Sequence, residues 1–89
     1  MLQRFIFLFI VVQISFSQNA EKLLEKGKTL YEEMDYSNAL KNLDKAIKLD
    51  DKLVDAFFYR GLTNTRLKNF KNAINDYSSA LNINSEDEL

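Results

Sequence analysis

Cysteine, histidine and proline are all absent from the 89-residue sequence. Without cysteine the chain can form no disulfide, and without histidine it lacks the imidazole on which the usual catalytic triads depend. Structural zinc sites, which are built mainly from these two residue types, are excluded for the same reason. The absence of proline leaves helices uninterrupted. The sequence therefore argues against an enzyme and predicts a nearly all-helical protein with neither a metal nor a cofactor.

Neither sign of charge dominates the sequence. It contains 12 lysine and arginine residues and 13 acidic residues, a formal net charge of −1. Nucleic-acid-binding proteins normally carry a marked basic excess, so no nucleic acid is expected as a partner. Neighbouring carboxylates such as Glu32 and Glu33 point to different faces of a helix, so they form no convergent acid–base pair. With 46% hydrophobic and 28% charged residues, the composition is that of one small globular domain.

Residues 1–17 differ in character from the rest of the chain. Arg4 gives a short positive start, an apolar run follows over residues 5–14, and small serines flank Phe16 at the end of the segment. This three-part layout is typical of a secretory signal peptide. We therefore predict that the segment is removed and that residues 18–89 are exported. The destination would be the periplasm, the outside of the cell or the lumen of the secretory pathway.

Two alternatives remain open for this segment. If it is not cleaved, it would act as a membrane anchor, although its apolar run is roughly half of the ~20 residues that an untilted transmembrane helix needs. The protein would then be a membrane-anchored adaptor, and only in that case is a membrane expected as a partner. The other alternative is a first helix of the domain, but four phenylalanines without amphipathic spacing argue against it.

Apolar residues recur at helical spacing from Asn19 onward, and short polar stretches divide the pattern into four segments. Short connections make neighbouring helices antiparallel, so the pattern predicts an all-α fold of two tandem helix-turn-helix hairpins with no strand. The expected elements are a first helix capped by Asn19 and carrying Leu23, Gly27, Leu30 and Met34; a turn at Asp35; a second helix capped by Ser37; a turn at Asp50 and Asp51; a third helix from Val54 to Leu67; and a fourth helix after a turn at Asn69 or Phe70.

A 34-residue repeat relates the two hairpins. The matching pairs are Gly27 and Gly61, Tyr36 and Phe70, Ala39 and Ala73, Leu43 and Tyr77, Ala46 and Ala80, and Ile47 and Leu81. Glycine inside a helix costs about 0.5–1 kcal/mol relative to alanine, so both glycines are expected where another helix comes close. The alanines are the matching small residues on the second helix of each hairpin. A period of this length is typical of solenoids, in which each hairpin buries its apolar face against the next.

These residues resemble the tetratricopeptide repeat (TPR) family, whose 34-residue units carry a conserved glycine, an Ala-x3-Phe segment and a further alanine. The resemblance covers a first repeat of about residues 20–53 and a second of about residues 54–87, and it implies a right-handed α-solenoid. Lys26 and Arg60 replace a usual leucine, and we expect their alkyl stems to cover apolar surface while the charges stay in water. Asn64 replaces an aromatic residue or leucine, so looser packing is expected there.

The resemblance also implies a function. In the family, the first helices of successive hairpins line a concave groove that holds a peptide or helix of another protein. Transferred to this sequence, the groove residues are Leu24, Lys28, Tyr31, Phe58, Leu62, Thr65 and Arg66. The family's clamp for a C-terminal carboxylate is not matched, because its positions read Leu24, Lys28 and Tyr59, so an apolar or mixed ligand is expected. The chain would be a non-enzymatic protein-interaction module, or a fragment of a larger TPR protein.

The C-terminal part of the sequence raises two further expectations. Repeat arrays normally cover their last helix with a polar capping element, but too few residues follow Ile83 to form another helix. Tyr77, Leu81 and the ring of Phe70 are therefore expected to stay exposed and to support self-association or docking to a larger partner. Residues 86–89, Glu-Asp-Glu-Leu, resemble an endoplasmic-reticulum retention signal except at its basic position, and a solvated acidic tail is the other interpretation.

Overall fold

The computed structural model describes the backbone of residues 2–88 and the side chains of residues 14–85. Its elements are α1 (Leu2–Glu32), α2 (Tyr36–Leu49), α3 (Val54–Arg66) and α4 (Phe70–Glu88). Over residues 2–88 the structure contains these four helices and no strand, so the predicted all-α class is confirmed. Across the same residues, no helix has both the length and the apolar character needed to cross a membrane.

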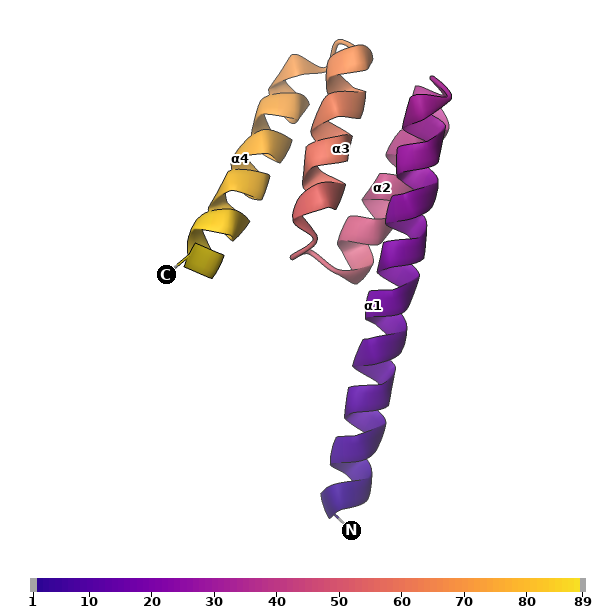
Figure 1. Ribbon diagram of the computed structural model, residues 1–89, viewed down its shortest axis with the longest axis vertical. Helices are drawn as coiled ribbons and strands as arrows, with labels where there is room; N and C mark the ends of the chain where they lie inside the picture. Colours follow the sequence, from indigo (N-terminus) through magenta and orange to yellow (C-terminus); the bar gives the residue numbers. More distant parts are fainter. Residues whose placement is uncertain (1, 89) are drawn as a thin grey trace.

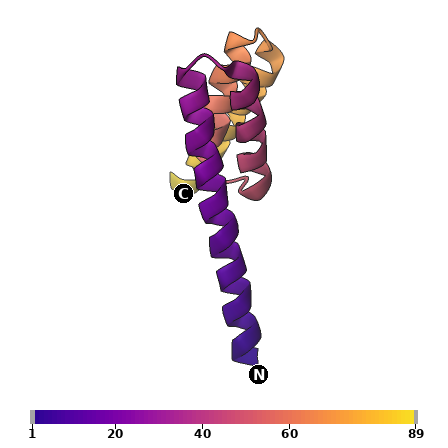
Figure 2. The ribbon, with the colours of Figure 1, turned by 90° about the vertical axis from the view of Figure 1, so that its right-hand side faces the viewer.

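The four helices form two hairpins that lie side by side. α1 runs antiparallel to α2, and α3 runs antiparallel to α4 (Figure 1). The hairpins are joined mainly by packing of α2 against α3, with a smaller contact between α1 and α3. The N-terminal part of α1 projects beyond the other helices, and the molecule measures 53 × 30 × 16 Å along its principal axes (Figure 2).

The starts of the first two helices differ from the prediction. Asn19 is not an N-cap but lies inside α1, which continues without interruption from Leu2. The reason is that no proline or glycine occurs before Gly27, so nothing stops the helix of the predicted signal segment from running into the domain. Ser37 is likewise inside α2, whose N-cap is Asp35. The Asp35 side chain receives a hydrogen bond of 2.9 Å from the amide of Asn38 rather than from the backbone.

The turns inside the two hairpins have the same geometry. Met34 and Lys68, which are 34 residues apart, both adopt φ = 65°. In each turn the following residue donates a backbone hydrogen bond to the carbonyl five residues earlier: Asp35 to Leu30 at 2.9 Å, and Asn69 to Asn64 at 2.8 Å. This pattern is a Schellman motif, which satisfies the last carbonyls of a helix. The sequence repeat is therefore repeated in the backbone.

This turn also corrects the position of Met34. The helical spacing placed it on the apolar stripe of the first helix, but α1 ends at Glu32 and Met34 is 74% exposed. Its left-handed conformation is needed to reverse the chain, and that requirement overrides the apolar spacing.

The core lies between the two hairpins and is built largely from small residues. Leu24, Leu43, Ala46 and Ala56 form its central cluster, contributed by α1, α2 and α3. Leu43 is fully buried and is one of the two largest side chains with no exposure among the described residues. The repeat alanines Ala39, Ala46, Ala73 and Ala80 are between 0% and 7% exposed. Because these side chains are short, the helices can pack at close range.

Both glycines lie at close contacts between the helices of a hairpin. A Cβ atom at Gly27 would lie 2.7 Å from the side chain of Leu43, and a Cβ atom at Gly61 would lie 2.7 Å from the ring of Tyr77. Leu43 and Tyr77 are themselves one repeat apart, so the same contact occurs in each hairpin. A separation below 3.0 Å leaves no space for a methyl group unless the neighbour moves. This contact explains why glycine occurs inside two helices despite its low helix propensity.

Candidate functional site

Most of the predicted groove residues lie on one face, which we call the α1–α3 face. It consists of Lys28, Tyr31, Phe58, Tyr59, Leu62, Thr65 and Arg66. Tyr31 of α1 and Tyr59 of α3 pack edge to face, with ring centroids 6.0 Å apart. At one end of this pair, Arg66 Nε donates a hydrogen bond of 3.4 Å to the Tyr31 hydroxyl. The face therefore joins the first helices of the two hairpins.

Aromatic rings continue from this face across the whole molecule. Tyr31 also packs against Tyr36 of α2, at a centroid distance of 5.6 Å. On the other side, Phe58 packs against Tyr59 at 5.7 Å and against Tyr77 of α4 at 6.1 Å. The tilted and edge-to-face geometries are those that aromatic quadrupoles favour, each stabilising by about 0.5–1.5 kcal/mol beyond the buried area. Five rings thus link all four helices.

The predicted groove residues differ in how accessible they are. Phe58 is 44% exposed, and Thr65 and Arg66 are also exposed, whereas Leu62, Lys28 and Tyr31 are half-buried. The Thr65 hydroxyl is already engaged, because it donates to the Gly61 carbonyl at 2.9 Å and lies 3.2 Å from the Tyr77 hydroxyl.

Leu24 requires a correction. It was predicted to face a partner, but it is only 6% exposed and belongs to the central core cluster. Its position on α1 turns it toward α2 and α3 rather than outward, because it packs with Leu43 and Ala56. Tyr59 takes its place on the α1–α3 face. From the sequence, this residue was expected only to depart from the family's carboxylate clamp.

Lys28 and Arg66 are held by their neighbours on this face. Lys28 Nζ lies 3.3 Å from a Glu25 carboxylate oxygen and 5.1 Å from the centroid of the Tyr59 ring. Burial alone lowers the pKa of Lys28, but the hydrogen bond and charge of Glu25 outweigh it and raise this pKa above its usual value. The hydrogen bond to the Tyr31 hydroxyl raises the pKa of Arg66. Both side chains therefore stay cationic at physiological pH.

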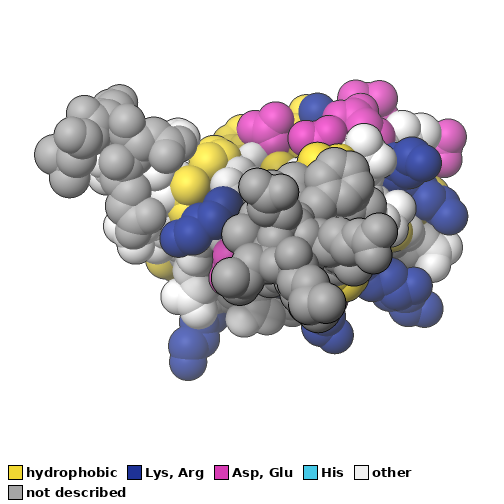
Figure 3. Space-filling model, turned by 90° about the horizontal axis from the view of Figure 1, so that it is seen from below, with side chains coloured by type: hydrophobic (Ala, Val, Ile, Leu, Met, Phe, Trp, Pro, Cys, Tyr) yellow, Lys and Arg dark blue, Asp and Glu magenta, His cyan; other side chains and the backbone are white. Residues whose placement is uncertain are grey.

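Charged side chains are distributed unevenly around the molecule. In the view from below, acidic side chains gather along one edge beside hydrophobic ones, and most lysine and arginine side chains lie toward the opposite edge (Figure 3). A hollow of about 390 Å³ opens next to the α1–α3 face. It is lined by Glu21, Leu24, Glu25, Lys52, Leu53, Val54 and Asp55. Apolar and acidic surface therefore occur together where α1 meets the start of α3.

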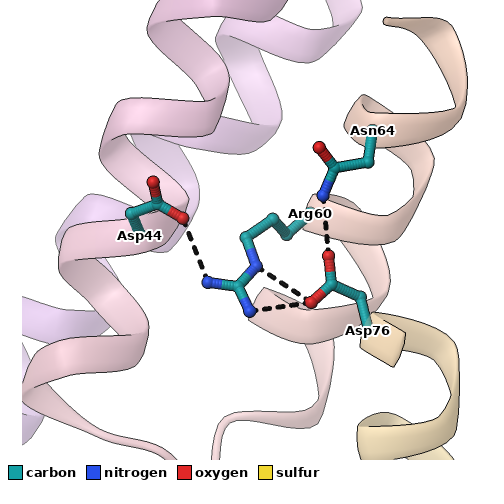
Figure 4. A network of polar contacts seen from close by, with 4 residues as sticks. All are labelled: Asp44, Arg60, Asn64 and Asp76. Atoms are coloured by element: carbon teal, nitrogen blue, oxygen red, sulfur yellow. Dashed lines mark hydrogen bonds and ion pairs between the residues drawn. The ribbon is translucent and has the colours of Figure 1, made fainter. Parts of the chain in front are cut away.

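A second cluster, the polar network, links α2, α3 and α4 (Figure 4). Arg60 donates to one Asp76 oxygen from Nε at 3.0 Å and from Nη2 at 2.7 Å, and it donates to Asp44 from Nη1 at 3.0 Å. The other Asp76 oxygen accepts a hydrogen bond of 2.9 Å from Asn64. Asp76 and Asn64 are 3% and 4% exposed, so the network is largely withdrawn from water.

The network explains the charge state of Arg60. Burial by itself lowers the pKa of the guanidinium, but the hydrogen bonds and charges of Asp76 and then Asp44 more than offset this and raise the pKa. All the contacts made by Asp76 are with groups of the chain itself, so its carboxylate has no unpaired oxygen that could serve as a general base. The cluster is therefore built to hold α3 against its neighbours.

This network contradicts one expectation from the sequence and contains a contact that the sequence did not predict. The Arg60 charge is not in water but is paired with two carboxylates, and Asn64 is buried with a hydrogen bond to Asp76. One signal could have revealed it: Arg60, Asn64 and Asp76 correspond to Lys26, Leu30 and Asn42 in the first repeat. Three departures on facing helices of one repeat indicate a polar contact between them. By contrast Lys26, the first-repeat counterpart of Arg60, is exposed as expected.

The polar network also borders a hollow of about 340 Å³, whose lining includes Asn69, Asn72 and Asn75 of the second turn and α4. Across the described side chains, no three acidic residues come together in a way that could hold a metal ion. Compared with known proteins, the chain matches no protein-family model and no curated protein closely enough to show a relationship.

Proposed function

We propose that this protein is a non-enzymatic protein-interaction module of the TPR type, and that its α1–α3 face binds a peptide or helix of another protein. The proposal rests on the 34-residue repeat, on the two hairpins with identical Schellman turns, and on the glycine contact that recurs in each hairpin. In such an array the two hairpins form a right-handed α-solenoid with the first helices on its concave side.

One observation carries the binding proposal: an aromatic and cationic surface remains accessible on α1 and α3. Phe58 is 44% exposed while its ring edge is fixed against Tyr59 and Tyr77. Rigid aromatic side chains lose little conformational entropy on binding and are enriched at the centres of interfaces. Lys28 and Arg66 border the rings and supply hydrogen-bond donors. The ligand that fits is an amphipathic segment with an apolar anchor for Phe58 and acidic or carbonyl groups for the two cations.

Selection from a library of short random peptides tests the groove without knowledge of the natural partner. Peptides selected on the whole chain should lose affinity roughly tenfold or more for Phe58→Ala, because a central aromatic anchor would be removed. Met34→Ala is the matched control, since Met34 is an exposed apolar residue in the turn after α1 and is not one of the residues of this face. If Phe58→Ala and Met34→Ala bind the selected peptides as tightly as the unmodified chain, the groove is not on this face.

We further propose that residues 1–17 are a signal peptide and that the protein is exported. The supporting observation is the three-part sequence layout, with the apolar run between Arg4 and the serines. A membrane-anchored adaptor is the alternative, and it is favoured by the uninterrupted α1, which would carry an uncleaved segment straight into the first repeat. Mass spectrometry of the chain after export distinguishes the two: a first residue at Gln18 supports cleavage, and a first residue at Met1 supports the anchor.

A further inference from the structure

The α1–α3 face differs in charge from one end to the other. α1 and α3 run in the same direction, so residue numbers increase the same way along the face in both helices (Figure 1). At its low-numbered end the face borders the hollow of about 390 Å³ that Glu21 and Asp55 help to line. At its high-numbered end Arg66 donates to the Tyr31 hydroxyl. A ligand that lies along the face therefore meets a different environment at each end.

The hollow, which we call the acidic hollow, combines apolar walls with a carboxylate rim. Its charged lining residues are three acids, Glu21, Glu25 and Asp55, and one cation, Lys52. Glu25 is paired with Lys28 at 3.3 Å, whereas no hydrogen bond or ion pair joins Glu21 or Asp55 to another side chain within residues 14–85. Both of these carboxylates are exposed. The apolar walls are buried or half-buried and consist of Leu24, Leu53 and Val54.

A lysine or arginine side chain of a partner suits the acidic hollow. Its alkyl stem covers apolar surface while its charged group stays at the rim, within reach of a carboxylate. An apolar side chain would cover the same walls, but it would take the carboxylates of Glu21 and Asp55 from water without giving them a partner. An acidic side chain would be repelled. The hollow therefore selects a basic residue.

Arg66 gives the other end of the face the opposite charge. Its guanidinium is exposed and donates one hydrogen bond of 3.4 Å to the Tyr31 hydroxyl. No carboxylate among the described side chains pairs with it. Arginine has five N–H donors and binds carboxylates through two parallel hydrogen bonds, so it can still accept an acidic ligand group. Lys28, in contrast, already has Glu25 as its partner.

Resting on the binding function proposed for the α1–α3 face, we propose that its ligand carries three side chains in a fixed order: a lysine or arginine in the acidic hollow, an apolar residue against Phe58, and an aspartate or glutamate at Arg66. On α3, Phe58 follows Asp55 by three residues and precedes Arg66 by eight. At a helical rise of about 1.5 Å per residue, Asp55 and Arg66 lie about 16 Å apart. An extended peptide rises about 3.3 Å per residue, so its basic and acidic residues are about five positions apart.

Peptides selected from a random library on the full-length chain provide the ligand for the test. Each is synthesised with an amidated C-terminus, so that side chains supply the only carboxylates. The selected sequences should carry a basic and an acidic residue on opposite sides of an apolar one. Asp55→Lys should weaken their binding roughly fivefold, because an attractive charge pair becomes a repulsive one. Replacing the basic residue of the peptide by glutamate should then restore much of the affinity.

The Arg66 end is tested in the same way. Arg66→Glu should weaken binding by a similar factor, and lysine in place of the acidic residue of the peptide should restore it. Each rescue should be confined to its own end, because exposed charges about 16 Å apart are largely screened at physiological salt. Glu33→Lys is the matched control for net charge, since Glu33 is exposed in the turn after α1 and is not one of the residues of the face. It should leave the affinity nearly unchanged.

A second variant guards against an effect of Asp55→Lys on folding. Asp55 lies in the first turn of α3, where an acid also stabilises the helix, so Glu21→Lys should reproduce the loss of affinity independently. If neither variant weakens binding more than Glu33→Lys, or if the peptide exchanges give no rescue, the charge order is overturned even where Phe58→Ala still weakens binding. Rescue of Arg66→Glu by exchange of the basic residue also overturns it. Binding that is unaffected by Phe58→Ala overturns the binding function of the face and this inference together.

Discussion

Removal of the Asp76 carboxylate is the perturbation that tests the packing of the second repeat most severely. Asp76→Ala keeps helix propensity in α4 but deletes the acceptor of three hydrogen bonds, two from Arg60 and one from Asn64. Arg60 would be left with Asp44 alone.

The magnitude follows from how far the partners are buried. Removing one partner of a buried ion pair costs about 3–5 kcal/mol, because the other charge is left uncompensated. Two features favour the lower end: the Arg60 side chain keeps 24% exposure, and the neighbouring hollow of about 340 Å³ admits water. We therefore expect Asp76→Ala to lower the free energy of unfolding by about 3 kcal/mol. For a domain of this size, that corresponds to a melting temperature lower by roughly 10–25 °C.

Urea denaturation followed by circular dichroism measures this change, and Asp44→Ala provides the matched control. Asp44 pairs with the same guanidinium at 3.0 Å but is 46% exposed, so its removal should cost only about 0–1 kcal/mol. The double variant Arg60→Met with Asp76→Leu removes both charges and should recover part of the stability lost in Asp76→Ala; the rest stays lost because the buried Asn64 amide still lacks its acceptor. If Asp76→Ala costs no more than Asp44→Ala, the network does not hold α3 and α4 together, and the reasoning from burial is refuted.

Three further predictions concern the glycine contact, the core and the secondary structure. Gly61→Leu should destabilise the protein by about 1–3 kcal/mol through overpacking against Tyr77, and an unchanged melting temperature would show that the helices are not in contact there. Leu24→Ala should lower the free energy of unfolding by about 2–5 kcal/mol because Leu24 is 6% exposed, while Leu62→Ala should lower it clearly less. If urea denaturation gives equal losses for the two variants, Leu24 is not a core residue. Far-ultraviolet circular dichroism should show a helical spectrum without a sheet component, and a dominant sheet signal would contradict the fold.

The sequence was sufficient to predict the all-α class, because apolar residues recur at helical spacing in every segment after the N-terminal one. It predicted less reliably the residues at which the helices begin and end. Ser37 was predicted as the N-cap of the second helix, yet the N-cap of α2 is Asp35, two residues earlier, since the Schellman turn fixes where the chain reverses. The same turn takes Met34 off the apolar stripe. Local capping preference could not reveal this, because the turn is defined by backbone hydrogen bonds and not by side-chain type.

The sequence also did not predict which side chains of different helices contact one another. Leu24 belongs to an apolar stripe in either interpretation, and only the packing of α2 and α3 against it decides that it is buried. Arg60 and Asn64 were understood as departures from a leucine pattern, whereas their partner Asp76 lies on the facing helix. Spacing along one helix predicts on which side of that helix a residue lies, but it does not predict whether the side chain that packs against the residue is polar or apolar. A comparison of the two repeats position by position recovers that information, since the departures occur together.

Mapping a bound peptide onto the folded chain tests the central claim most directly. Amide chemical shifts of the isotope-labelled full-length chain would be recorded by nuclear magnetic resonance during titration with a peptide selected on it. We predict that the largest changes fall on Tyr31, Phe58 and Leu62 of the α1–α3 face and spare the exposed lysines 41, 45 and 48 of α2. Changes centred on α2, with the α1–α3 face unaffected, would contradict the claim that the first helices of the two hairpins form the binding surface.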